Sequence, residues 1–154
     1  MMRKIVNPWR NPKMEAVLEL VVPFHDLDPM EVVWHGNYFK YLEQAREVLL
    51  KQLGYGYQQM YESGYMWPVV DAQLKYRHVL TFDQKIAIRA VLLEFENRLK
   101  IGYEIRDVQT GQVATTAYTI QVAIDALTRE LSFESPAVFR ENVLAIIDGG
   151  HLPC

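Results

Sequence analysis

Groups capable of acid–base or nucleophilic chemistry are concentrated in one short stretch, FHDLDPMEVVWHGNY, which covers residues 24–38. It contains two of the four histidines and three carboxylates, namely His25, His35, Asp26, Asp28 and Glu31. A carboxylate can attack a carbonyl carbon or activate a water molecule for that attack. Free backbone N–H groups at a helix start can stabilise the oxyanion that then forms. The stretch therefore predicts hydrolysis at a carbonyl, with Asp28 as the candidate carboxylate.

Simpler roles are open to the same residues. Asp28 precedes Pro29, and an aspartate in that position is a common start of a turn. An aspartate near a helix start is also often only a cap. A metal site is a further alternative, but its candidate ligands lack a recognised spacing, and we predict no metal site; these ligands are His25, Asp26, Asp28 and His35.

A strand and a helix flank this stretch and must position it. Residues Glu15–Phe24 are rich in β-branched and large apolar residues, which predicts a strand. Asn37 to Leu53 predicts the longest helix, with Gly36 or Asn37 as its N-cap and Gly54 as its stop. Its apolar stripe recurs at steps of three and four residues: Tyr38, Tyr41, Leu42, Ala45, Leu49 and Leu53.

The rest of the chain predicts a sheet and a terminal helix. Residues Gly54–Met66 are expected to form a loop or short helix. Four strand-like segments joined in succession by hairpins follow: Pro68–Val79, Gln84–Glu96, Leu99–Arg106 and Gln112–Ile124. Ser135-Pro136 then opens an amphipathic helix.

This order of elements predicts an α+β fold, an antiparallel sheet of about five strands wrapped around the long helix. Residues 1–14 are expected to be an irregular arm, residues 15–148 one domain, and residues 149–154 a tail. The chain length of 154 residues fits a single domain.

Composition excludes several classes of protein. The net charge of −3 argues against nucleic-acid binding, which normally needs a basic surface. The single cysteine, Cys154, excludes an internal disulfide. No apolar run is long enough for a membrane span, and the N-terminus lacks the apolar core of a signal peptide. We therefore expect a cytoplasmic protein.

Residues 26–38 (DLDPMEVVWHGNY), followed by YLEQAR at 41–46, resemble the signature of the 4-hydroxybenzoyl-CoA thioesterase family of hotdog-fold proteins. Weaker similarity extends over nearly all of Glu15–Val143. The resemblance implies the hotdog fold and hydrolysis of an acyl-CoA or acyl-carrier-protein thioester to a free acid and a thiol. It implies no cofactor, and a homodimer or homotetramer with the pocket at the subunit interface.

The resemblance also assigns roles to individual residues. It makes Asp28 the catalytic nucleophile or general base, and it makes the N–H of His35 the group that polarises the thioester carbonyl, with the imidazole also implicated. Glu43 matches an acidic helix position, for which an ion pair with Arg46 is the simpler interpretation. The substrate-contact candidates are Glu31, Trp34, Asn37, Tyr38, Glu43 and Trp67. Candidates for contact with CoA phosphates are Lys75, Arg77, Arg89, Arg98 and Lys100, which could equally be a solvated strand face.

One departure from the family pattern keeps alternatives open. Glu31 stands where the family has a glycine, which could reshape the pocket or signal lost activity. A hotdog module that binds acyl groups without hydrolysing them is therefore one alternative. The other is a hotdog dehydratase, in which His35 would work with Glu43.

Overall fold

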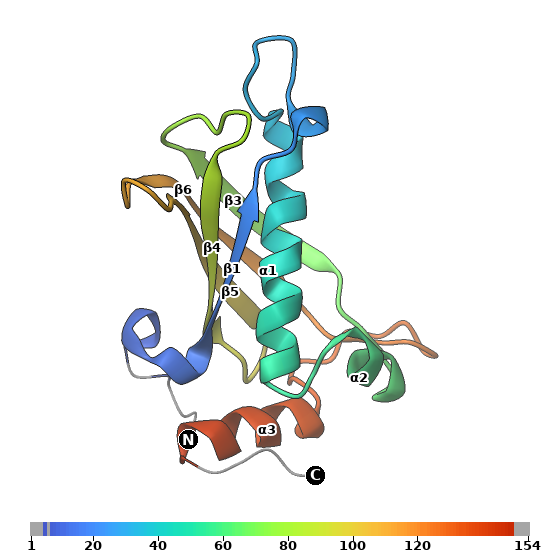
Figure 1. Ribbon diagram of the computed structural model, residues 1–154. Coiled ribbons are helices and arrows are strands. Elements are labelled where there is room, and N and C mark those ends of the chain that lie inside the picture. The colour runs from blue at the N-terminus through green and yellow to red at the C-terminus, as the bar shows by residue number, and fades with distance from the viewer. Residues whose placement is uncertain (1–4, 6, 150–154) are drawn as a thin grey trace.

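The computed structural model describes residue 5 and residues 7–149, and one long helix lies on the inner face of a curved antiparallel sheet (Figure 1). The helix is α1 (Tyr38–Gln52). The five strands, in their order across the sheet, are β1 (Glu15–Val21), β4 (Lys85–Glu94), β5 (Leu99–Asp107), β6 (Val113–Gln121) and β3 (Val69–Tyr76). The predicted α+β architecture is confirmed.

Smaller elements complete the fold. Helix α2 (Tyr57–Glu62) confirms the short helix expected after α1, and α3 (Ala137–Ile147) confirms the C-terminal helix. A two-stranded sheet was not predicted, because its strands are too short to show a period: β2 (Tyr65–Met66) and β7 (Ile124–Asp125). Four 3-10 turns are also present: Pro8–Arg10, Pro12–Met14, Phe24–Asp26 and His35–Asn37.

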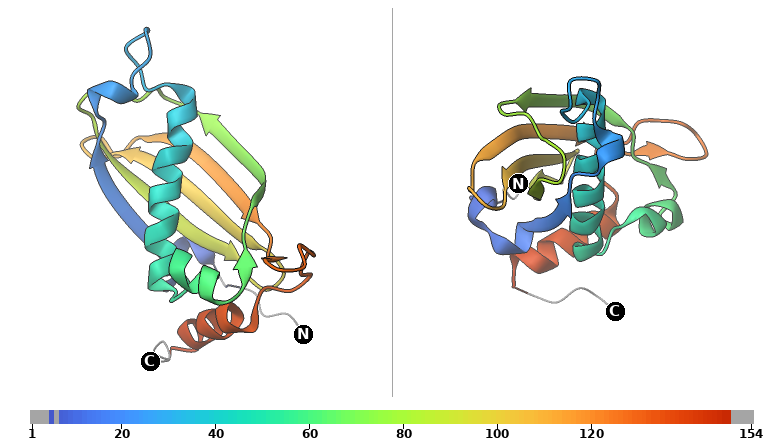
Figure 2. Two further views of the ribbon diagram at one scale, coloured as in Figure 1. Left: turned by 90° about the vertical axis from the view of Figure 1, so that its right-hand side faces the viewer. Right: turned by 45° about the horizontal axis from the view of Figure 1, so that its top comes forward.

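The core forms between α1 and the sheet. The helix buries the predicted apolar stripe, including Leu42 and Leu49, and it packs chiefly on β1 and β4. Figure 2 shows the helix lying across the concave face of the strands. On β5, Ile101, Tyr103 and Ile105 point toward the helix and are fully buried, as period-two alternation predicts. Burying each such side chain contributes about 1.5–3 kcal/mol.

The expected succession of hairpins is wrong for β3. This strand pairs with β6, with Leu74 opposite Ala117, whereas β4 lies between β1 and β5. The connection over residues 77–84 therefore crosses from one side of the sheet to the other. Alternation along a strand shows which face is buried but not which strand is its neighbour. As a result, β3 lies at the edge of the sheet and most of its residues are exposed.

Several expectations concern the termini. The boundaries proposed for the arm (1–14) and the tail (149–154) lie partly outside the described residues and stay predictions, and Cys154 lies wholly outside them. Within the described part of the chain, no helix is both long enough and apolar enough to cross a membrane.

Candidate active site

The connection between β1 and α1 lies at the N-terminal end of the helix, where it forms the loop at the top of Figure 1. Leu27 pairs with Val33 as an isolated antiparallel bridge, which brings the two arms of the loop together. Between them the Asp28 N–H donates to Val32 O over 2.8 Å, and the Glu31 N–H donates to Asp28 O over 2.9 Å. Residues 28–31 therefore form a tight turn with Asp28 as its first residue.

The Asp28 carboxylate is half-buried in this turn. Its Oδ1 atom accepts the Met30 N–H over 2.8 Å, so one oxygen stabilises the turn as expected for an aspartate before proline. Its Oδ2 atom accepts no hydrogen bond from the described residues. The structural role and a chemical role are therefore compatible, because each can use a different oxygen.

Glu31 completes the turn in a left-handed backbone conformation, with φ = 65°. This is the conformation that glycine adopts without a steric cost, whereas another L-residue loses about 1–2 kcal/mol. The substitution of glutamate for the family's glycine therefore leaves the path of the backbone intact. The Glu31 side chain is exposed, so the structure supports neither its involvement with Asp28 nor a collapse of the loop.

The first turn of the helix offers unpaired backbone donors. Residues His35–Asn37 form a 3-10 turn that runs directly into α1. Among the described residues, the N–H groups of His35 and Gly36 have no hydrogen-bond acceptor. The positive end of the helix dipole adds to their attraction for negative charge. This end of the helix can therefore stabilise an oxyanion.

Asn37, one of the two predicted candidates, lies at the N-cap position of α1, but its side chain does not act as a cap. Asn37 has helical dihedral angles and its side chain caps no N–H group of the helix. Its Nδ2 atom donates instead to the backbone oxygen of Asp26 over 2.9 Å, and the Trp34 N–H donates to the same oxygen over 2.9 Å. The asparagine therefore fastens the loop to the helix start.

Trp34 lies over the backbone of this first turn. A Cβ atom at Gly36 would fall 2.3 Å from the indole ring, so glycine is required for the ring to lie there. The indole centroid is 5.1 Å from that of the His35 ring. Trp34 is 49% exposed, which leaves one part of the ring available to a ligand. Trp34 is thus a wall beside the free N–H groups.

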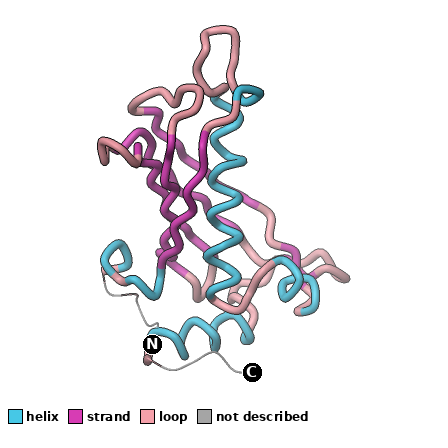
Figure 3. Tube along the Cα trace, in the orientation of Figure 1, coloured by secondary structure: helices cyan, strands magenta, loops and turns pink. Residues whose placement is uncertain are grey.

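Residues of β3 and the crossing connection hold the same turn from the other side. The Tyr76 hydroxyl donates to His35 O over 2.9 Å, and the Val33 N–H donates to Leu80 O over 2.8 Å. Tyr38 is 2% exposed and packs edge-on against Tyr76 at 4.7 Å. Burial raises the pKa of Tyr38. Tyr38 is therefore a core residue that shapes the helix start. Figure 3 shows the connection from β1 to α1 and the connection from β3 to β4 as loops at the same end of the sheet.

A buried carboxylate that the sequence analysis did not assign to the site lies below the turn. Asp26 is 4% exposed, and its Oδ2 atom accepts the Tyr41 hydroxyl over 2.6 Å. Burial and this hydrogen bond raise the pKa of Tyr41. In the sequence, Tyr41 belongs to the apolar stripe of the helix and to the YLEQAR segment of the family signature. The signal was its hydroxyl, since a buried tyrosine usually needs a hydrogen-bond partner.

Two predicted contact residues lie away from this end. Trp67 is 9% exposed and lies in an aromatic cluster with Tyr55 and Phe139, beyond the C-terminal end of α1. Glu43 is exposed on α1, and the expected ion pair with Arg46 is absent from the described residues. Burial lowers the pKa of Arg46, but nearby Tyr103 and Tyr57 outweigh that effect and raise it. Arg46 therefore faces the sheet.

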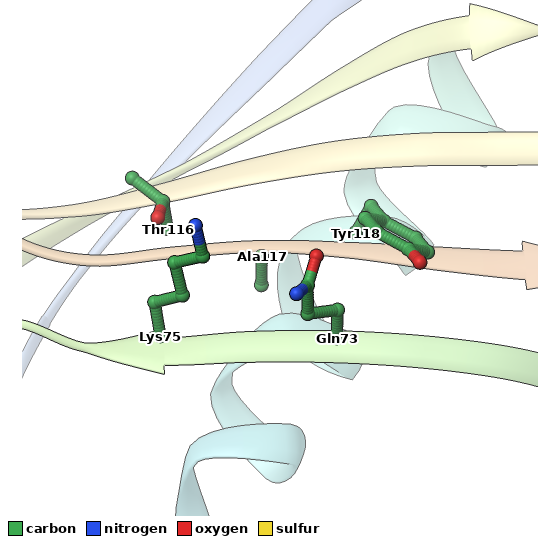
Figure 4. Close-up of a pocket in the computed structure, with 5 residues that line it drawn as sticks. All are labelled: Gln73, Lys75, Thr116, Ala117 and Tyr118. Atoms are coloured by element: carbon green, nitrogen blue, oxygen red, sulfur yellow. The ribbon is translucent and has the colours of Figure 1, made fainter.

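The basic residues proposed for phosphate contact lie in different surroundings. Arg89 is engaged by Glu15 and Glu104, and Arg98 by Glu94. Lys75 lines a pocket of about 200 Å³ on the sheet face away from α1, formed by residues of β3 and β6 (Figure 4). No group of three or more metal-ligating side chains occurs within residues 7–149.

Comparisons with known proteins identify the family to which the chain belongs. The model of the thioesterase-like superfamily matches residues 22–146. "Putative esterase sll0410" of Synechocystis is 30% identical over 87% of this chain and 85% of its own. "Putative acyl-CoA thioesterase YneP" of Bacillus subtilis is 27% identical over 70% of this chain and 78% of its own.

Solved structures show the same fold. The structure of a 4-hydroxybenzoyl CoA thioesterase complexed with 4-hydroxybenzoyl CoA superposes with a TM-score of 0.73, at 20% identity, over 84% of this chain and 98% of that one. This likeness confirms the hotdog architecture, and the family match confirms the resemblance carried by residues 26–46. The chain therefore belongs to the thioesterase-like superfamily of hotdog-fold thioester hydrolases.

Proposed function

We propose that the protein hydrolyses an acyl-CoA thioester to a free acid and CoA, with Asp28 as the reacting carboxylate. The observation that carries the proposal is one short loop that holds both the turn at residues 28–31 and, where it enters the helix, two unpaired N–H groups, those of His35 and Gly36. The names of the relatives supply the substrate class, since one is named "Putative acyl-CoA thioesterase YneP" and another is a thioesterase complexed with 4-hydroxybenzoyl CoA. A carrier-protein thioester has the same reacting group and is the alternative substrate.

The chemistry requires only two kinds of group. The Asp28 carboxylate takes a proton from water, whose oxygen attacks the carbonyl carbon, or the carboxylate attacks that carbon itself. The carbonyl oxygen becomes negatively charged and accepts hydrogen bonds from the N–H groups of His35 and Gly36. The C–S bond then breaks, and the sulfur leaves as the thiolate of CoA. In the direct-attack route, water subsequently hydrolyses the mixed anhydride on Asp28.

The dehydratase alternative is less well supported. It requires the His35 imidazole and the Glu43 carboxylate to act on one substrate. The two residues are eight positions apart, which is about 12 Å along a helix. No carboxylate pairs with His35 among the described residues. The non-hydrolytic alternative rests on Glu31, whose left-handed conformation preserves the turn that a glycine would form.

We also propose that the active unit is a homodimer joined along β3. One edge of this strand has no partner within the described chain, and Val70 and Tyr76 on it are 57% and 48% exposed. An exposed edge strand of eight residues that carries exposed apolar side chains is a template for pairing with another strand. Tyr76 also contacts His35, so a partner along β3 would close the open side of the candidate site.

The proposal is tested by incubating the protein with a panel of aliphatic and aromatic acyl-CoA esters and measuring released thiol with DTNB. The expected result is turnover of at least one ester by the wild type and loss of that turnover in Asp28→Asn. Tight binding of the esters without turnover would support the non-hydrolytic module instead. Dehydration of a 3-hydroxyacyl-CoA, followed by absorbance, would support the dehydratase.

A further inference from the structure

We propose that Asp26 and Tyr41 form a positioning pair, which fixes the Asp28 turn against the first turn of α1 and thereby sets the rate of the chemical step. The inference rests on the proposed function, because it concerns the alignment of the reacting carboxylate with the free N–H groups. Neither residue is placed in contact with the substrate. Each acts through the backbone to which it is attached.

The first support is the way in which the Asp26 side chain is bound. Its two oxygens receive donors from two successive residues of α1, the Tyr41 hydroxyl at 2.6 Å and the Lys40 ammonium at 3.3 Å. The Asp26 side chain is 5% exposed, whereas that of Lys40 is 58% exposed. Tyr41 is thus the buried and shorter of the two attachments. A buried charge–hydroxyl bond of this kind has a strongly preferred geometry.

The second support is the backbone oxygen of the same residue. It accepts the Trp34 N–H and the Asn37 side chain, each over 2.9 Å. Asp26 therefore joins three parts of the site, which are the start of the loop, its end at Trp34, and the first two turns of the helix. Asp26 is also the last residue of the 3-10 turn over Phe24–Asp26, which adds rigidity to the start of the loop.

The consequence for Asp28 follows from the distance along the chain. Only Leu27 separates Asp28 from this junction, and Leu27 is itself paired with Val33. A shift of Asp26 is therefore transmitted to Asp28 relative to the helix start. A misplacement of about 1 Å in a reacting group can lower a rate about 100-fold. A pocket of about 280 Å³ borders Asp26, Lys40 and Tyr41, so the junction has room to move once the bond is lost.

The test compares two buried tyrosines, each of which forms a hydroxyl hydrogen bond, at two different positions in the fold. Tyr41→Phe removes the hydroxyl bound to Asp26, and Tyr103→Phe removes an equally buried hydroxyl bound to Thr119 at 2.8 Å. Tyr103 is 1% exposed and lies on β5 near Arg46, away from the helix start. Steady-state kinetics with the best ester from the panel give kcat and KM for both variants, and thermal melts give their stabilities.

We expect Tyr41→Phe to lower kcat by about 10–100-fold with KM changed by less than about threefold, because alignment matters chiefly in the transition state. We expect Tyr103→Phe to keep kcat within about twofold of the wild type. Its melting temperature should fall about as much as that of Tyr41→Phe, because each variant loses one buried hydrogen bond. Equal kcat values for the two variants would overturn the proposal. An inactive wild type would instead refute the proposed hydrolysis, and the two failures are thus distinguishable.

Asp26→Asn provides a second variant that preserves side-chain size. An amide has one acceptor oxygen in place of two, so it can keep the Tyr41 bond but loses the Lys40 contact. The expected loss in kcat is smaller, about 3–10-fold, again with little change in KM. In the double variant Tyr41→Phe/Asp26→Asn the losses should not multiply, since both act through one junction. A wild-type kcat in Asp26→Asn would also contradict the proposal.

Discussion

At its N-terminal end, α1 meets an exposed loop held by individual hydrogen bonds, whereas at its C-terminal end it meets a closed cluster of aromatic rings. Met30 and Trp34 at the first end are 76% and 49% exposed. At the other end Tyr55 and Phe139 are fully buried and their rings stack at 4.9 Å. The helix of 15 residues separates the two regions by about 22 Å.

The two regions also differ in how completely their polar groups are hydrogen-bonded. In the aromatic cluster the Trp67 Nε1–H donates to the Tyr55 hydroxyl over 3.1 Å, and that hydroxyl bonds Ser63 Oγ over 2.7 Å. At the helix start, by contrast, two N–H groups and one carboxylate oxygen of Asp28 are left unpaired within the described residues. Unpaired groups do not add to stability, but they are available to a substrate. The C-terminal end of α1 therefore contributes mainly to the stability of the fold, whereas its N-terminal end holds the groups that are free to act on a substrate.

The largest expected effect is on catalysis, in Asp28→Asn. The amide oxygen can still accept the Met30 N–H, so the free energy of unfolding should change by less than about 0.5 kcal/mol. We expect kcat to fall by about 10²–10⁴-fold, because the general base or nucleophile is lost. Thiol release and urea denaturation measure the two quantities. Large changes in both would show that this end is also a structural centre.

The next effect is on stability, in Phe139→Ala. Removing this fully buried ring, which contacts both Tyr55 and Trp67, should lower the free energy of unfolding by about 3–5 kcal/mol. The kcat of the folded fraction should stay within about threefold of the wild type. Denaturation followed by circular dichroism gives the first value, and kinetics at low temperature give the second. A loss of kcat comparable to that of Asp28→Asn would show that the aromatic cluster also determines catalysis, which contradicts the comparison.

Gly36→Ala tests the wall at the helix start. The new Cβ atom would meet the Trp34 indole at 2.3 Å and must displace it. We expect kcat/KM to fall about 10-fold, with a shift in tryptophan emission. The matched control is Gly56→Ala, where the new Cβ atom meets the flexible Lys51 side chain at 3.1 Å. That variant should retain full activity; equal losses in the two would contradict the assignment of Trp34.

The smallest effect is expected for Glu31→Gly. Relief of the left-handed conformation at φ = 65° should raise the free energy of unfolding by up to about 1 kcal/mol. Arg129→Gly, at φ = 64° in the turn after β7, should give a similar gain and serves as the control. Neither change should alter kcat by more than about threefold. A rise of kcat in Glu31→Gly alone would identify Glu31 as a restraint on activity.

The features that could be predicted from the sequence are those with a local cause. The apolar stripe of α1 and the alternation along β5 are periodic, and each defines a buried face without knowledge of the fold. The backbone requirement at Glu31 was predictable because the family has a glycine at that position.

The features that escaped prediction depend on contacts between distant residues. The pairing of β3 with β6 joins segments about 45 residues apart in sequence, and the connection at residues 77–84 pairs with the Asp28 loop through Val32 and Thr81. The side chain of Asn37, at the N-cap position, donates to Asp26 O and caps no helix N–H group, which depends on the fold of the loop. The aromatic cluster around Trp67 depends on α3, which places Phe139 beside it. The spacing of residues along the chain does not predict such contacts, because the partners are far apart in sequence.

The most direct measurement is a crystal structure of Asp28→Asn bound to the acyl-CoA that the wild type hydrolyses best. The account predicts the thioester oxygen within about 2.7–3.1 Å of the N–H groups of His35 or Gly36, with the residue-28 amide facing the carbonyl carbon. A thioester bound elsewhere, for example against the outer face of β3 and β6, would contradict it.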